Sequence, residues 1–550
     1  MPRLEKRVGL LFFFCLLMLM GIMARAFYLQ GIQGSSYASQ AAGQQQDIIE
    51  VPGLRGAILD RNGQQLAGSE PGASIYATPY QIKDPNKESE DVAKALGADQ
   101  DDVYEAITQP GGFSYVAKKV DLKHAGKVEK LGLEGIGQHP DTIRTRPQGD
   151  LASQVIGAVN EEGDGLSGLE ASQDSVLKGV NGKRRIVKDA LGDAIRLDNL
   201  GDSSDGKPVE LTLDASIQAK AEEVLAEVGE TYSPKNASAV VMDTRTSQVL
   251  AMANWPPVDL DHLEDASSDS LLNIGTSYTY EPGSTFKAIT VASALETGTV
   301  TPESSFTLAP SIQVYDRTIE ESHPRGTVTL SVGDILAQSS NVGAVTIGLK
   351  MGGRKFSNWI DKFGFGHQTG IEYPGEEQGI VLPYKDWSGS TIGNVPIGQG
   401  LAVTPIQMVE AYGALANGGV LRTPKLVKSI GGVKTPTDPG KQIIRPEVAT
   451  EVRDMLKGVL APGGTASEVS VPGYTLAGKT GTAQIATKDG YSDSRYVASF
   501  MGIAPADNPA IAVSVMVSEP QGPHTGGEVA APAFGDLASF TLPYLGVPTG

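Results

Sequence analysis

The chain has 550 residues, of which 40% are hydrophobic and 20% charged, an ordinary globular composition with enough apolar material for two or three folded domains. Its formal net charge of −19 at pH 7 argues against nucleic acid as a partner, because proteins bind that polyanion largely through clustered lysine and arginine. The only cysteine, Cys15, lies in an apolar run near the N-terminus, so the rest of the chain can form no disulfide, thiolate zinc site or cysteine nucleophile.

The first predicted element is a membrane-spanning helix. Residues Val8 to Ala24 are uncharged and apolar, at the lower end of the spanning range of roughly 17 to 25 residues. Basic residues precede this run, which predicts a cytoplasmic N-terminus at 1–7, a single-pass cell-membrane anchor at 8–29 and all later residues outside. A cleaved signal peptide is the alternative, because Ala24-Arg25-Ala26 mimics a cleavage site. The long apolar core and the bulky residues after it favour an uncleaved anchor.

Two segments are expected between the anchor and the C-terminal half. Residues 30–46 are small, polar and rich in glutamine, which indicates a helical stalk. Residues 47–207 combine strand-like runs with helical patterns at 90–97 and 101–108, which predicts an α+β pedestal domain. This region carries no concentrated set of nucleophile and base, so we expect it to have a structural or partner-binding role.

Residues 208–550 are predicted to form one α/β domain. A strand at 209–214 and an amphipathic helix from Ala215 precede a hairpin over 237–254. Near the C-terminus, residues 496–519 again give two apolar, β-rich runs, split by a Pro-Ala-Asp-Asn-Pro turn. Strands at both ends with helices between them predict a sheet that the two ends of the domain complete together.

The first candidate for a reactive group is Ser284, in the segment Glu281-Pro-Gly-Ser-Thr-Phe-Lys287. Turn formers precede a helix-like run, so Ser284 is expected near a helix start with Lys287 on the same face. A lysine whose pKa is depressed by burial could take the serine's proton, and N–H groups at the helix start could stabilise an acyl oxyanion. Taken alone, this Ser-x-x-Lys pattern is better explained by an N-capping serine and a surface lysine.

Two further motifs follow in order along the chain. Ser339-Ser340-Asn341 comes after a helical stretch, and Lys479-Thr480-Gly481-Thr482 opens a strand-like run. With Ser284 and Lys287 they match the S-x-x-K, S-x-N and K-T-G set of penicillin-binding proteins and their β-lactamase relatives. The six histidines lie in no metal-binding or Ser-His-Asp setting, so neither a metal nor a cofactor is expected.

Each residue of the later motifs has a role in that pattern. Ser339 can relay a proton to the leaving amine, and Asn341 can hydrogen-bond the peptide backbone of the substrate. An edge strand suits the third motif, because Lys479 with the hydroxyls of Thr480 and Thr482 can hold a carboxylate. Gly481 is expected to leave room for substrate beside the strand.

Through these motifs the sequence resembles the class B penicillin-binding proteins, which are monofunctional D,D-transpeptidases. The likeness covers nearly the whole exported chain, including the segments 51–67, 155–170, 211–222, 397–419 and 526–538. In that family, residues matching six positions here serve domain packing and partner contact: Arg55, Gly56, Asp60, Arg61, Gly168 and Glu170. The family fold, a five-stranded antiparallel sheet flanked by helices, agrees with the predicted α/β domain.

The resemblance implies a transpeptidase that cross-links peptidoglycan stem peptides through a Ser284 acyl-enzyme and binds β-lactams covalently. The backbone N–H groups of Ser284 and Thr482 would form the oxyanion hole. Ser-Ser-Asn followed by Val-Gly resembles the FtsI-type septal and sporulation enzymes, which favours a role at the division septum. The pedestal is too short for a glycosyltransferase domain, so a separate polymerase and division proteins are the expected partners.

Other functions remain open on the same motifs. A β-lactamase shares them but needs a base for its deacylating water and no anchor or pedestal. A membrane-anchored sensor or scaffold could keep an acylatable serine, although the few residues before the anchor leave no room for a cytoplasmic effector domain. An elongation-type transpeptidase is the third alternative.

Overall fold

The computed structural model describes residues 2–37, 46–188, 194–267, 269–488 and 490–550. The chain divides into two compact units. The first comprises Met1–Leu54, Glu70–Ile143 and Gly179–Gly206, and the second comprises Arg55–Ser69, Arg144–Lys178 and Lys207–Gly550.

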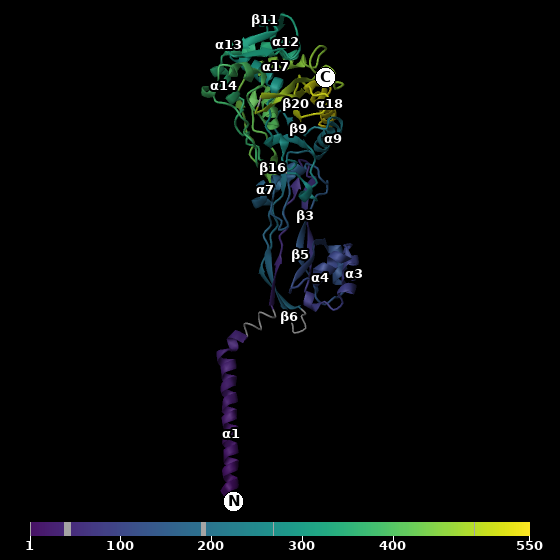
Figure 1. The fold of residues 1–550 in the computed structure, drawn as a ribbon, viewed down its shortest axis with the longest axis vertical. Coiled ribbons are helices and arrows are strands. Elements are labelled where there is room, and N and C mark those ends of the chain that lie inside the picture. Colours follow the sequence, from purple (N-terminus) through teal and green to yellow (C-terminus); the bar gives the residue numbers. More distant parts are fainter. Residues whose placement is uncertain (1, 38–45, 189–193, 268, 489) are drawn as a thin grey trace. The chain divides into compact units, whose positions relative to one another are not determined.

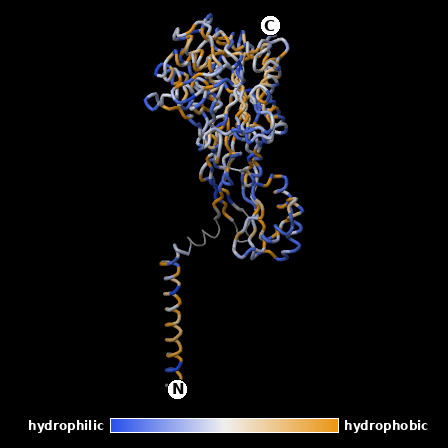
Figure 2. The backbone as a smooth tube through the Cα atoms, turned by 45° about the horizontal axis from the view of Figure 1, so that its top comes forward, coloured by the Kyte–Doolittle hydropathy of each residue, from blue (hydrophilic) through white to orange (hydrophobic). Residues whose placement is uncertain are grey.

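The N-terminal segment forms the helix α1 (Pro2–Phe27), which continues into a short π-helical turn, η1 (Tyr28–Ile32). Figure 2 shows its predominantly hydrophobic character. The segment Leu4–Ile32 is long and apolar enough to cross a membrane, and none of the residues in its most apolar window is buried by protein. This confirms the predicted apolar helix. Residues 34–37 of the predicted stalk are helical, and residues 38–45 of it lie outside the described residues.

The first unit contains two antiparallel β-layers. In one, β6 (Gly182–Lys188) pairs with both β1 (Gln46–Val51) and β7 (Ala194–Gly201). In the other, the later part of β3 (Gln65–Ala77) lies between β4 (Ser114–Asp121) and β5 (Ile136–Thr145).

Three helices bury the second of these β-layers: α3 (Pro85–Leu96), α4 (Gln100–Thr108) and α5 (Leu122–Glu129). Ile75 of β3 and Val92 of α3 are fully buried in their shared core. Aspartates cap all three helices at their N-termini, and Gly97 ends α3 in a left-handed conformation. The helices predicted at 90–97 and 101–108 are therefore confirmed.

The second unit is built on a five-stranded antiparallel sheet in the order β10-β9-β21-β20-β19, of which β9 and β20 are labelled in Figure 1. Its strands are β9 (Asn236–Asp243), β10 (Val249–Trp255), β19 (Ala477–Thr487), β20 (Gly490–Ala504) and β21 (Ile511–Ser518). β9 and β21 pair over their full length, so the early and late segments of the domain meet at the centre of the sheet. This confirms the predicted five-stranded sheet.

Helices cover this sheet. α9 (Ala215–Tyr232) and α18 (Gly526–Tyr544) pack against each other and against the strands. α16 (Pro405–Ala416) also packs against the strands, and all its residues are buried. Strand residues are small where the helices approach: a Cβ on Gly502 would overlap the Phe534 ring of α18. Between β10 and β19 the chain also forms α10 (Ile274–Ser277), α11 (Lys287–Glu296), β11 (Ser305–Leu308), β12 (Ser311–Val314), β13 (Arg317–Glu320), β14 (Val328–Ser331), α12 (Val332–Ala337), α13 (Asn341–Met351), α14 (Gly353–Lys362), α15 (Thr391–Asn394) and α17 (Pro446–Lys457).

A smaller group of elements belongs to the same unit. β2 (Ile58–Leu59) pairs in parallel with β8 (Val209–Leu211), which pairs with β16 (Val427–Ile430) and through it with β17 (Val433–Lys434). The short helices α6 (Ser153–Ile156), α7 (Gly168–Ser172) and α8 (Asp174–Leu177) lie beside them, and β15 (Val420–Leu421) pairs with β18 (Lys441–Gln442).

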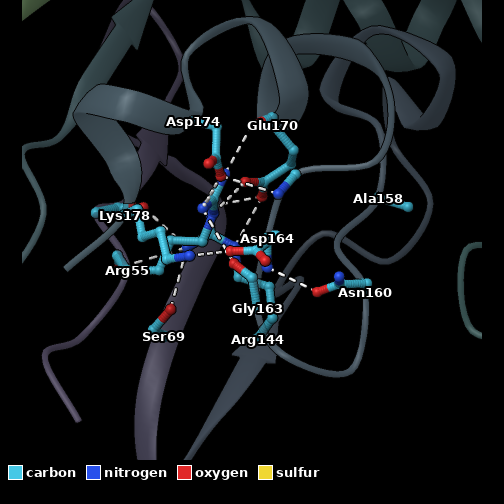
Figure 3. Close-up of polar contacts among 12 residues, drawn as sticks. Arg55, Ser69, Arg144, Ala158, Asn160, Gly163, Asp164, Glu170, Asp174 and Lys178 are labelled. Carbon is cyan, nitrogen blue, oxygen red and sulfur yellow. Dashed lines mark hydrogen bonds and ion pairs between the residues drawn. The ribbon is translucent and has the colours of Figure 1, made fainter. Parts of the chain in front are cut away.

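A buried ionic cluster joins the early segments of this unit (Figure 3). The Arg55 guanidinium donates to Glu170 and to Asp174, each at 2.6 Å, and Arg144 Nε donates to the second oxygen of Glu170 at 2.8 Å. Arg55 and Glu170 are almost fully buried, so each charge depends on the others for its solvation. Two of the residues singled out by the family resemblance thus lie at the centre of this cluster.

Candidate active site

The segment before α11 places Ser284 at the start of a helix. Gly283 has a positive φ of 53°, and its N–H donates to the carbonyl of Gly398 at 3.0 Å. The two glycine backbones approach so closely that a Cβ on Gly398 would overlap Gly283. The chain then forms the 3₁₀ turn η4 (Gly283–Phe286), which continues as α11. The predicted helix start at Ser284 is confirmed, with a 3₁₀ first turn.

Lys287 is fully buried beneath this turn. Its Nζ donates to the Ser339 carbonyl at 2.5 Å and to Asn341 Oδ1 at 2.7 Å, and the Ser339 hydroxyl lies 3.3 Å away. Burial lowers the pKa of Lys287 to about 7, against a smaller opposing effect of Glu321. In the described part of the chain, Lys287 makes no hydrogen bond to Ser284.

The Ser339-Ser340-Asn341 motif forms the junction of two helices. A capping box between Ser331 and Asp334 starts α12, and Ser340 caps α13 by accepting the Gly343 N–H at 2.9 Å. Ser339 has a φ of 59°, in the left-handed region that a serine rarely adopts. This conformation presents the Ser339 carbonyl to Lys287, which supports the view that backbone strain is retained here for the geometry of the site.

The third motif lies on β19, the edge strand of the sheet, as predicted. Thr480 Oγ1 is 2.7 Å from Thr465 Oγ1, and Thr482 Oγ1 accepts the Gly526 N–H at 3.1 Å. Lys479 is fully buried, and burial together with the nearby Lys287 charge lowers its pKa well below the ordinary lysine value.

Gly481 has a packing role in the structure. A Cβ at Gly481 would lie 2.9 Å from the Pro282 carbonyl and would overlap the Ser499 hydroxyl. The missing side chain therefore permits the close packing of β19 against the turn that precedes Ser284, and the room it leaves is filled by protein.

A polar cleft of about 520 Å³ brings the three motifs together. Five of the eight predicted site residues line it: Ser284, Ser339, Asn341, Thr480 and Thr482. The other three, Lys287, Lys479 and Gly481, are buried around it. Over the described residues, no group of three His, Cys, Asp or Glu side chains is arranged to hold a metal ion.

Several residues of the site carry no sequence motif. His323, Thr465, His524 and Thr525 line the cleft, from loops that sequence reasoning left without a role. Glu321 accepts hydrogen bonds from the Ser340 hydroxyl and the Asn341 N–H. These residues reach the site only through the tertiary fold, and nothing local in their sequence marks them.

A second carboxylate, Glu281, lies three residues before Ser284. It accepts hydrogen bonds from the Gly400 N–H at 2.9 Å and from the Tyr491 hydroxyl at 3.1 Å. Burial raises the pKa of Glu281, and these hydrogen bonds oppose that effect. Tyr491 belongs to β20, so this contact ties the far end of the β19–β20 hairpin to the turn carrying the serine.

Comparison with known proteins agrees with this geometry. Residues 237–539 match the family model of the penicillin-binding protein transpeptidase domain, and residues 50–211 match that of the penicillin-binding protein dimerisation domain. The chain belongs to the class B penicillin-binding proteins. It is 34% identical to stage V sporulation protein D of Bacillus subtilis, over 99% of this chain and 86% of that protein. It is 30% identical to peptidoglycan D,D-transpeptidase FtsI of Escherichia coli, over 96% of this chain and 90% of that one.

The solved structures lead to the same family. Penicillin-binding protein 3 of Mycobacterium tuberculosis in complex with aztreonam superposes with a TM-score of 0.72 at 29% identity, covering 92% of this chain and 98% of that one. Penicillin-binding protein 2X of Streptococcus thermophilus gives a TM-score of 0.76 at 25% identity, covering 90% and 80%. The family resemblance and fold class expected from the sequence are confirmed.

Proposed function

We propose that this penicillin-binding protein cross-links peptidoglycan by acyl transfer through Ser284. The single observation that carries the proposal is the cleft itself. Ser284, Asn341 and Thr480 come from segments far apart in the chain and line one cavity. The buried Lys287 amine donates a hydrogen bond to Asn341 in the wall of this cavity. The D,D-transpeptidase relatives and the transpeptidase family match support the same activity.

The proposed first step is attack by Ser284 Oγ on the carbonyl carbon between the two terminal D-alanines of a stem peptide. Neutral Lys287 takes the hydroxyl proton, and Ser339 passes a proton to the departing amine as the C–N bond breaks. The N–H groups of Ser284 and Thr482 stabilise the oxyanion. Terminal D-alanine leaves, and Ser284 holds the remaining peptide as an ester.

In the second step, an amine of a neighbouring stem peptide attacks the ester and the serine oxygen leaves with a proton. In both steps Asn341 binds the peptide backbone. In the first step, before terminal D-alanine leaves, the Thr480 and Thr482 hydroxyls bind its carboxylate, with the Lys479 side chain behind them. A β-lactam amide enters the same first step and acylates Ser284. Penicillin-binding protein 3 of Mycobacterium tuberculosis has been solved in complex with the β-lactams aztreonam and ampicillin.

We further propose the placement of the enzyme in the cell. Residues 1–7 are cytoplasmic, 8–29 anchor the chain in the membrane, 30–46 form a stalk, 47–207 the pedestal and 208–550 the transpeptidase domain outside. The Ser-Ser-Asn-Val-Gly sequence and the sporulation and FtsI relatives support action at the division septum, beside a separate glycosyltransferase and division proteins. A reporter fused to the C-terminus that is active only outside the cytoplasm tests the orientation.

Labelling with a fluorescent penicillin tests the chemistry. The parent chain should be labelled at Ser284, and both Ser284→Ala and Lys287→Ala should lose the label while keeping the parent's circular dichroism spectrum. Undiminished label in either variant contradicts the proposed roles. Release of the bound penicillin should be slow, and rapid multiple turnover would identify a β-lactamase in its place.

A further inference from the structure

Glu321 lies outside the three motifs, in the segment that follows β13, yet its side chain is only 6% exposed. Its Oε1 accepts the Ser340 hydroxyl at 2.6 Å, and its Oε2 accepts the Asn341 N–H at 2.8 Å. The Arg325 guanidinium pairs with the same carboxylate and lies 3.2 Å from the Ser340 hydroxyl. One buried carboxylate therefore holds the first residues of α13, at the end where the helix dipole favours a negative charge.

Asn341 connects this carboxylate to the amine beneath the cleft. Its Nδ2 donates to the Glu320 carbonyl at 2.9 Å, and its Oδ1 accepts from Lys287 Nζ at 2.7 Å. The amide nitrogen thus faces an acceptor and the amide oxygen faces a donor, and these two contacts fix the orientation of the side chain. The path from the Glu321 carboxylate to the Lys287 amine passes through a single residue.

The charges around Lys287 are few and come from different elements. Glu321 is the carboxylate that acts on it, and its negative charge favours the protonated amine. On β19, burial and then the Lys287 charge lower the pKa of Lys479, which is the one other lysine seen to interact with Lys287 in the described residues. The junction of α12 and α13 offers the amine neutral oxygens, those of Ser339 and Asn341.

Glu321 itself remains ionised near neutral pH. Burial alone raises its pKa, but the hydrogen bonds from Ser340, Arg325 and the Asn341 N–H together outweigh burial and hold the pKa below the ordinary value. A permanent negative charge thus stands close to an amine whose neutral form is required for the reaction.

We propose that Glu321 is a positioning residue of the acylation step, which fixes the Ser340–Asn341 turn against Lys287 and biases the amine toward its protonated form. This inference rests on the proposed function, in which neutral Lys287 activates Ser284. A purely structural helix cap would fix the turn without affecting the protonation of Lys287, so the pH profile separates the two roles.

The test measures the rate of acylation by fluorescent penicillin from about pH 5 to about pH 9 on the full chain in detergent. Glu321→Gln keeps the shape and a hydrogen-bond acceptor but removes the charge. The midpoint of its pH–rate profile should fall by about one pH unit relative to that of the parent. Arg325→Gln removes the cation that offsets Glu321, and its midpoint should rise. Glu303→Gln removes an exposed carboxylate outside the cleft and should leave the midpoint unchanged.

An unmoved midpoint in Glu321→Gln, with only a lower plateau rate, would show a structural cap and overturn the inference. Should Glu321→Gln fail to fold, Arg325→Gln decides: a raised midpoint supports the inference and an unchanged one rejects it. Absence of labelling in the parent would refute the proposed function as well, whereas a labelled parent with an unshifted Glu321→Gln refutes only the role of Glu321.

Discussion

The Lys287 amine and the Asn341 carboxamide are joined by a 2.7 Å hydrogen bond, and the same amine donates to the Ser339 carbonyl at 2.5 Å. A neutral amine has two N–H bonds and one lone pair. Because these two acceptors engage both N–H bonds, the lone pair is left for a hydroxyl. The Ser339 hydroxyl lies 3.3 Å away, and in the proposed reaction the lone pair takes the proton of the Ser284 hydroxyl. In the proposed reaction the second motif thus orients the base as well as the substrate.

The first prediction concerns the pH dependence of acylation. With the pKa of Lys287 lowered to about 7 by burial, the reactive neutral amine forms as the pH rises through that value. The rate of penicillin acylation should therefore fall about tenfold per pH unit below the midpoint and level off above it. Stopped-flow measurement of labelling would reveal this profile. A rate independent of pH between about 5 and 9 would remove Lys287 as the base.

The second prediction concerns stability. The pKa of Lys287 is lower in the folded chain than the ordinary 10.5, so between these values the unfolded state binds more protons. The free energy of unfolding should consequently rise with pH from about 7 to about 10. Below about pH 7 the full cost of burying the protonated Lys287 amine should remain. Lys287→Met removes the buried amine and should be more stable than the parent at low pH, by a margin of a few kcal/mol that shrinks as the pH rises.

Urea denaturation of both chains across this pH range measures the difference. Since other groups titrate equally in the two proteins, subtracting one curve from the other isolates Lys287, apart from the coupled Lys479. A constant difference at all pH values would contradict the depressed pKa.

The sequence predicted those parts of the site that depend on local spacing. Ser284 and Lys287 share a helix turn, and Lys479 to Thr482 follow one edge strand, so short patterns locate them. Glu321 was missed because its contacts with Ser340 and Asn341 are made by a loop whose own sequence carries no periodicity or motif. The contacts of Lys287 were likewise unpredictable, since they depend on the left-handed backbone at Ser339.

The third prediction uses the close packing at Gly481. Alanine there would overlap the Ser499 hydroxyl and approach the Pro282 carbonyl to 2.9 Å, so the strand and the serine turn must move apart. Gly481→Ala should slow penicillin acylation about tenfold or more and destabilise the fold by about 1 to 3 kcal/mol. Gly126→Ala, in a helix where the added Cβ meets nothing within 4 Å, is the matched control and should leave acylation unchanged. Equal rates in the two variants would refute this account of Gly481.

The last prediction concerns the buried ionic cluster of Arg55, Glu170 and Arg144 (Figure 3). Glu170→Ala would leave the buried Arg144 guanidinium without its carboxylate and Arg55 with Asp174 alone, and such uncompensated buried charge typically destabilises a fold by about 3 to 5 kcal/mol. Calorimetry should show a clear loss of thermal stability, while penicillin labelling below the melting temperature persists, because the cluster contributes no residue to the cleft. Glu223→Ala removes a carboxylate from the surface pair with Lys220 and should change stability by less than about 1 kcal/mol. Comparable losses of stability in the two variants would show that the buried Glu170 contributes no more to stability than the exposed Glu223.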